Sequence, residues 1–212
     1  MSLAQAALFL RDWSQAVGPQ TLRLVAVDGR AGSGKSTFAK CLSQALGGTP
    51  ILPLDDFLSW DDLTEFWPRL EAQVLRPLFE GRDARYQARD WEHDPYGRGL
   101  GPWKDFPFSP LVILEGVGSA RKVLRSRLAY AIWIDTPPQL CLERGISRDG
   151  TERARLWVEW QEREAVFFES DPVRSHVHLI VDGQRPFEDG TGLSRSAAEQ
   201  NRDAVLACAV SA

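Results

Sequence analysis

The fold is decided by a stretch near the N-terminus, residues 22–37, which reads LRLVAVDGRAGSGKST. Leu22 to Val27 is a short apolar run of the kind found in strands that are buried on both faces. From Gly29 the chain fits the pattern G-x-x-x-x-G-K-S, and a helical pattern follows over residues 35–46. A strand, this loop and a helix in that order predict a phosphate-binding loop.

Each residue type in this loop has a chemical reason. Glycines adopt positive φ and let backbone N–H groups curl around phosphate oxygens, and the following helix points its positive end at the same anion. Lys35 would reach the β- and γ-phosphates, the Ser36 hydroxyl would bind Mg²⁺, and Thr37 would contact the α-phosphate. We therefore expect ATP and Mg²⁺ as cofactors. The predicted nucleotide-binding residues are Gly29, Arg30, Ala31, Gly32, Ser33, Gly34, Lys35, Ser36 and Thr37.

Outward from the loop, apolar strand patterns recur over residues 50–54, 111–114, 129–134 and 176–181. Helical patterns alternate with them over residues 35–46, 61–79, 137–147 and 151–169. This alternation predicts a single α/β domain over residues 1–212, a three-layer P-loop fold with a five-stranded parallel sheet and helices on both faces. We also expect an amphipathic helix over residues 3–17 and a last helix capped by Ser194 or Ser196.

Composition excludes several function classes. A net charge of −4 over 212 residues is unlike a dedicated nucleic-acid binder. Three scattered cysteines predict reduced thiols rather than disulfides or a zinc site. We see no signal peptide and no apolar run long enough for a membrane helix, so we expect a cytoplasmic protein without nucleic-acid or membrane partners. A homodimer stays open.

Two further acidic positions follow predicted strands. Glu115 ends the run Leu111–Leu114 and would therefore sit beside the phosphate loop, where a Mg²⁺ ligand is needed; the alternative is a glutamate at an exposed strand end. Asp55 and Asp56 follow the strand at 50–54. A carboxylate there could orient an acceptor hydroxyl, take its proton and contribute to the metal site, or it could merely cap a helix.

An arginine cluster surrounds a helix–glycine–helix junction at residues 144–156, and it predicts a small lid over the transferred phosphoryl group. Arg144 and Arg148 are the predicted catalytic members. The alternative is a solvated helix face paired with nearby glutamates. Residues 81–110 form a second unusual segment, rich in aromatic, proline and glycine residues and too long for a casual connection.

With these features placed, the chain resembles the uridine kinase-like branch of P-loop kinases, which includes phosphoribulokinase and bacterial pantothenate kinase. The match spans about residues 22–183 and is nearest to uncharacterised bacterial uridine kinase-like proteins. Asp55-Asp56-Phe57 matches the family's Asp-Ser-Phe string, and Glu115-Gly116 matches its Glu-Gly. Arg144, Arg148-Asp149 and Arg153-Ala154-Arg155 follow the family's lid spacing, with Ala154 in place of a glycine.

The resemblance implies that Asp55 acts as base and that residues 81–110 bind the acceptor. In that segment the candidates are Tyr86, Asp90, Trp91 and His93, with Asp56 beside the base. These aromatics could stack on a ring and the polar groups could bind hydroxyls, or the segment could pack on itself; both interpretations stay open.

The sequence therefore predicts a kinase that phosphorylates a hydroxyl group of a small molecule, a nucleoside among the candidates. Two rivals come from other classes. A P-loop ATPase coupled to a macromolecular partner would be stimulated by that partner and need no small acceptor. A nucleotide-sensing module without catalysis would bind ATP and tolerate loss of Asp55.

Overall fold

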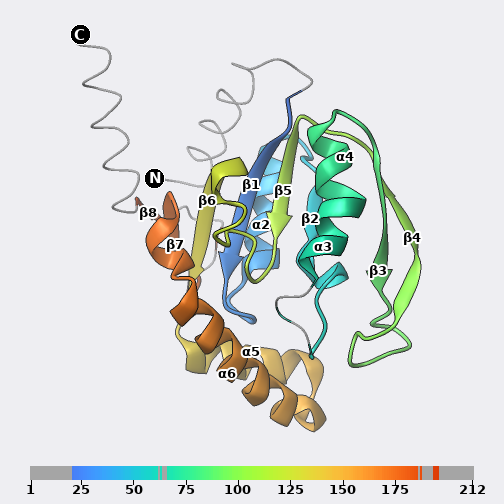
Figure 1. Cartoon of the computed structure of the whole chain (residues 1–212). Helices are drawn as coiled ribbons and strands as arrows, with labels where there is room; N and C mark the ends of the chain where they lie inside the picture. Colours follow the sequence, from blue (N-terminus) through green and yellow to red (C-terminus); the bar gives the residue numbers. More distant parts are fainter. Residues whose placement is uncertain (1–20, 62, 64–65, 186, 188–192, 196–212) are drawn as a thin grey trace.

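The computed structural model describes residues 21–61, 63, 66–185, 187 and 193–195. Its centre is a six-stranded sheet in the order β2-β5-β1-β6-β7-β8 (Figure 1). The strands are β1 (Arg23–Gly29), β2 (Ile51–Pro53), β5 (Leu111–Glu115), β6 (Leu128–Asp135), β7 (Leu179–Asp182) and β8 (Leu193–Arg195). Five of them are parallel, which confirms the predicted α/β fold, and β8 adds an antiparallel edge.

The helices connect these strands much as their apolar spacing predicts. They are α2 (Lys35–Ala45), α3 (Trp67–Leu70), α4 (Arg76–Phe79), α5 (Pro138–Asp149) and α6 (Ala154–Ser170). A π-helical turn at Glu71–Leu75 joins α3 to α4. This helical stretch begins at Trp67 rather than at the expected Asp61, with Pro68 in its first turn, where proline is tolerated. The helix predicted over residues 3–17 lies outside the described residues.

Both faces of the sheet are buried, which explains the uninterrupted apolar strands. On one face, Val25 and Val27 of β1 pack with Phe38 and Leu42 of α2. On the other, Leu24 and Ala26 belong to a cluster that takes in α3, α4 and α6. Alternate residues of β1 therefore belong to two hydrophobic clusters, one on each face of the sheet. Figure 1 shows α2 behind the sheet, with α3 and α4 on its opposite side.

The segment 81–110, which the sequence left without regular structure, contains a β-hairpin of β3 (Ala84–Arg89) and β4 (Leu100–Phe106). In β3 alternate residues are buried, so that the strand packs one face on the helical layer. Nearly every residue of β4 is at least partly exposed, so the strand carries no apolar alternation. That absence is why the sequence pattern did not indicate it.

A second correction concerns the C-terminal end of the described chain. Ser194 does not cap a helix, because it pairs with Ile180 within the antiparallel β7–β8 ladder. Ser196 and the alanine-rich residues that follow lie outside the described residues. A period-2 strand of three residues is too short to be told from a helix cap by pattern alone.

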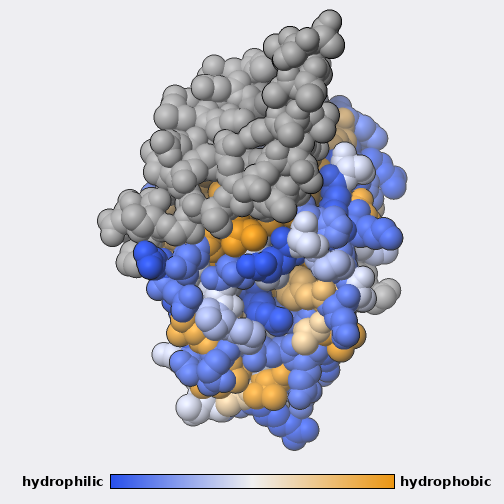
Figure 2. All heavy atoms as spheres, turned by 90° about the vertical axis from the view of Figure 1, so that its left-hand side faces the viewer, coloured by the Kyte–Doolittle hydropathy of each residue, from blue (hydrophilic) through white to orange (hydrophobic). Residues whose placement is uncertain are grey.

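Figure 2 shows the side turned to the left in Figure 1. On this face of the described part, hydrophobic residues form small separate patches among hydrophilic ones. Within the described ranges, no helix is both long and apolar enough to span a membrane.

Asp28, at the end of β1, joins two loops at the carboxyl edge of the sheet. Its carboxylate is fully buried and accepts N–H groups from Gly29 (2.7 Å), Gly118 (3.0 Å) and Ala120 (2.7 Å). Burial raises the pKa of Asp28 to about 6, although these three N–H groups and the charge of Lys35 pull the pKa down. One side chain thus connects the start of the phosphate loop to the loop that follows β5.

We expect Asp28→Asn to change how stability depends on pH. The ordinary pKa of 3.8 applies to the unfolded chain, whereas the folded value is about 6. As pH falls from 7 towards 4, the folded protein takes up this proton first, so the free energy of unfolding of the wild type rises relative to that of the variant. Urea unfolding of both proteins at several pH values measures the difference. A difference that stays constant with pH would contradict the raised pKa.

Candidate functional site

The phosphate loop runs from Arg30 to Gly34 between β1 and α2. Gly32 and Gly34 have φ values of 80° and 100°, the left-handed region that favours glycine. A Cβ at Gly32 would lie 2.2 Å from the carbonyl oxygen of Cys141, so the first turn of α5 packs directly on the loop. The first N–H groups of α2 have no acceptor within the helix and are available to an anion.

Lys35, Ser36 and Glu115 meet beneath this loop. Lys35 is largely buried and donates its ammonium to the carbonyl of Arg30 at 2.9 Å. The Ser36 hydroxyl donates to a carboxylate oxygen of Glu115 at 3.3 Å. Burial raises the pKa of Glu115 to about 7, with the charge of Lys35 acting against the rise and that of Asp55 adding to it.

The hydroxyl and carboxylate pair suits Mg²⁺. This ion prefers oxygen ligands and usually takes one or two from the protein, with the rest from phosphates and water. Among the described residues, no group of three or more histidine, cysteine, aspartate or glutamate side chains could hold a metal by itself. Ser36 and Glu115 therefore fit an ion that arrives together with a phosphate ligand.

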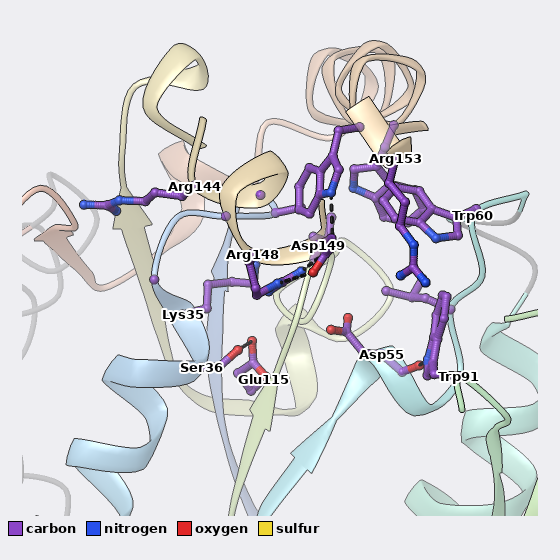
Figure 3. Close-up of a pocket in the computed structure, with 18 of the residues that line it drawn as sticks. Lys35, Ser36, Asp55, Trp60, Trp91, Glu115, Arg144, Arg148, Asp149 and Arg153 are labelled. Carbon is purple, nitrogen blue, oxygen red and sulfur yellow. Dashed lines mark hydrogen bonds and ion pairs between the residues drawn. The ribbon is translucent and has the colours of Figure 1, made fainter. Parts of the chain in front are cut away.

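Asp55 stands on the opposite side of the same cavity. It lies in the 3₁₀ turn Leu54–Asp56 that follows β2, and its side chain is exposed. Because β2, β5 and β1 are neighbours in the sheet, their carboxyl ends place Asp55, Glu115 and the phosphate loop around one cavity of about 450 Å³. Figure 3 shows Asp55 across from Lys35 and Ser36.

The predicted lid arginines differ in their surroundings. Arg148 borders the cavity and forms a two-point ion pair with Asp149, at 2.7 and 3.1 Å. Figure 3 shows it beside Lys35, and its hydrogen bond to Asp149 raises the pKa of the guanidinium further. Arg144 instead donates to the carbonyl of Gly183 at 2.9 Å, and its side chain points away from Asp55. Arg153 reaches into the cavity above Asp55.

Of the predicted acceptor-binding residues, Trp91 lines the cavity and the others do not. Trp91 donates its indole N–H to the carbonyl of Asp55 at 2.8 Å. Asp56 faces away from it and accepts the Tyr86 hydroxyl at 2.7 Å, deep against the hairpin. Asp90 and His93 pair with each other at the surface, 2.9 Å apart, and neither lines the cavity.

Sequence reasoning missed three tryptophans that line the cavity. We call Trp60, Trp157 and Trp160 the tryptophan wall. Trp60 makes edge-on contacts with the other two, with ring centroids 5.6 Å apart in each case. The signal was present in the sequence, because eight tryptophans in a chain of this length is a high content and two of them share a face of α6.

Sequence reasoning also missed two residues next to the phosphate loop, because their positions depend on tertiary packing. Glu164 of α6 is fully buried and accepts the backbone N–H of Ala31 in the phosphate loop at 2.7 Å. Phe187 packs edge-on against Phe38 of α2 and borders a second hollow behind the phosphate loop, shared with Thr37 and Arg144. Neither residue belongs to a local motif.

No family model matches the chain, and no curated protein matches it in sequence. Solved structures do match the fold. A possible uridine kinase from Bacillus stearothermophilus has a TM-score of 0.60 at 19% identity, covering 86% of this chain and 100% of that one. D-glycerate 3-kinase from Cryptococcus neoformans var. grubii also has a TM-score of 0.60, at 13% identity, covering 91% of this chain and 97% of that one.

A third structure, from Silicibacter sp. TM1040, is provisionally assigned as a fructose transport system kinase. It has a TM-score of 0.56 at 20% identity, covering 81% of this chain and 95% of that one. At these identities the likeness is one of fold. The chain therefore shares the α/β P-loop fold of these structures, as its phosphate loop and its alternating strands and helices predict.

Proposed function

We propose that this protein transfers the γ-phosphoryl group of ATP to a hydroxyl group of a small molecule. The observation that carries the proposal is the convergence of three strand ends on one cavity. β1 leads into the phosphate loop, β5 ends at Glu115 and β2 leads to Asp55. Phosphoryl transfer depends on positioning and electrostatic stabilisation, and these are the groups that it requires.

In this proposal the loop amides and Lys35 bind the nucleotide phosphates, and Lys35 gives up its bond to the Arg30 carbonyl to do so. Ser36 and Glu115 would hold Mg²⁺, which neutralises charge on the β- and γ-phosphates when it is bound. The hollow bordered by Thr37, Arg144 and Phe187 continues from the far side of the loop and offers room for the nucleotide base.

Asp55 is the proposed base. It would accept the proton of the acceptor hydroxyl as that oxygen bonds to the γ-phosphorus, while the bond from this phosphorus to the β–γ bridging oxygen breaks and ADP leaves. Arg148, held by Asp149 beside Lys35, would stabilise the charge of the group in transit. Arg144 would act on the nucleotide side, because its guanidinium is held at Gly183.

The acceptor would occupy the space between Asp55, Trp91 and the tryptophan wall. Indole faces pack well on the faces of rings, which favours a nucleoside or a sugar. This space also favours a kinase over an ATPase that serves a macromolecular partner, because it offers a small molecule a site at the proposed base. The possible uridine kinase and the D-glycerate 3-kinase that are similar in fold support the same general class.

We expect Asp55→Ala to lower turnover by roughly 100-fold or more, the usual contribution of a general base, while MgATP binds nearly as before. Lys35→Ala should instead weaken MgATP binding and abolish transfer. ADP release measured with a panel of nucleosides, sugars and other alcohols tests both. Asp105→Ala is the matched control, because Asp105 is a highly exposed aspartate on β4. Acceptor-stimulated turnover that survives in Asp55→Ala would rule out the base assignment and favour the sensing module.

Glu115→Gln should raise the Mg²⁺ concentration needed for half-maximal ADP release by roughly 10- to 100-fold, because an amide replaces the buried carboxylate that shares the metal site with Ser36. A Mg²⁺ titration at saturating ATP measures this shift. Asp105→Ala, titrated in parallel, is the control, because Asp105 is exposed on β4 and does not line the cavity. An unchanged Mg²⁺ requirement in Glu115→Gln would exclude Glu115 from the metal site.

A further inference from the structure

Glu164 is an acidic residue on the buried face of α6, where apolar side chains are usual. On α6 it shares a buried face with Trp157, Trp160 and Phe167, and its own side chain has 0% exposure. A buried carboxylate is costly unless charges or hydrogen-bond donors compensate it. The contacts of Glu164 therefore need a reason beyond packing.

Those contacts lead to the phosphate loop. One carboxylate oxygen accepts the N–H of Ala31 at 2.7 Å, across 133 residues of sequence. The guanidinium of Arg30 lies 3.8 Å from the other oxygen. The Ala31 amide is thereby turned towards α6, which leaves the later amides of the loop for a bound phosphate.

The Glu164 oxygen that accepts the Ala31 N–H also accepts the indole N–H of Trp160, at 2.9 Å. Trp160 supports Trp60 edge-on, and both line the cavity. Figure 3 shows Trp60 on the side of Asp55 and Trp91, across from Lys35 and Ser36. A single carboxylate thus contacts the phosphate loop and the wall of the acceptor space.

We propose that Glu164 is a positioning residue that couples the two halves of the site: nucleotide bound at the phosphate loop shifts the tryptophan wall through Ala31, Glu164 and Trp160. This inference rests on the proposed function. Coupling between two sites is reciprocal, so a filled acceptor space would favour nucleotide binding equally. A residue that only stabilised α6 would not transmit such a response.

Indole N–H resonances of ¹⁵N-labelled protein provide the test. The chain has eight tryptophans, so the spectrum has few peaks, and Trp160→Phe and Trp60→Phe assign the two that matter. Saturating MgADP should shift both peaks in the wild type. In Glu164→Met, which keeps the length of the side chain but removes both acceptor oxygens, MgADP should bind about fivefold or more weakly and leave the Trp60 peak in place.

Glu162→Met is the matched control, because Glu162 is an exposed acid on the same helix and should behave as the wild type. If Glu164→Met does not fold, Trp160→Phe cuts only the link to the wall, and there the Trp60 peak should stop responding. Trp60 and Trp160 peaks that ignore bound MgADP, or that move equally in Glu164→Met, would overturn the coupling and leave the kinase proposal intact. Failure of the wild type to bind MgADP in calorimetry would overturn both.

Discussion

The buried carboxylate of Asp28 is the constraint on which the site depends. It accepts the N–H of Gly29, the last residue of β1, and the N–H groups of Gly118 and Ala120 in the loop after β5, so that loop is held beside the start of the phosphate loop. Parallel strands bring their carboxyl ends to one edge, but the loops beyond that edge could still diverge. Hydrogen bonds to a charged acceptor are among the stronger ones, and here they tie two loops together before any ligand binds.

The parts of this molecule that sequence predicts best are those whose chemistry is local. The phosphate loop lies between a strand and a helix, and Glu115 and Asp55 each follow an apolar run, so strand order alone brings them together. Asp56 could not be separated from Asp55 by pattern, because neighbouring aspartates look alike until the turn sends one to Tyr86. The hairpin strand β4 was missed because it buries almost nothing.

Residues whose meaning depends on how α6 crosses the molecule could not be predicted. The spacing 157, 160, 164 and 167 places Glu164 on the apolar face of a helix, yet its partner in the phosphate loop is 133 residues away in sequence. The tryptophan wall likewise joins Trp60, from the loop after β2, to α6. Tertiary contacts of this kind form the proposed acceptor side of the cavity, whereas the phosphate-loop motif forms the proposed nucleotide side.

The strand edges described above also bear on solubility. Unpaired edges can recruit strands from other molecules and begin aggregation. Here β8 covers one side of β7, and the edge strand β2 at the other end of the sheet is only three residues long. The hairpin strand β4 is longer and exposed, but it carries Pro102, which has no N–H to donate, and the charged pair Lys104 and Asp105. The described strand edges are thus short or interrupted by proline and charged residues, which disfavours edge-to-edge association.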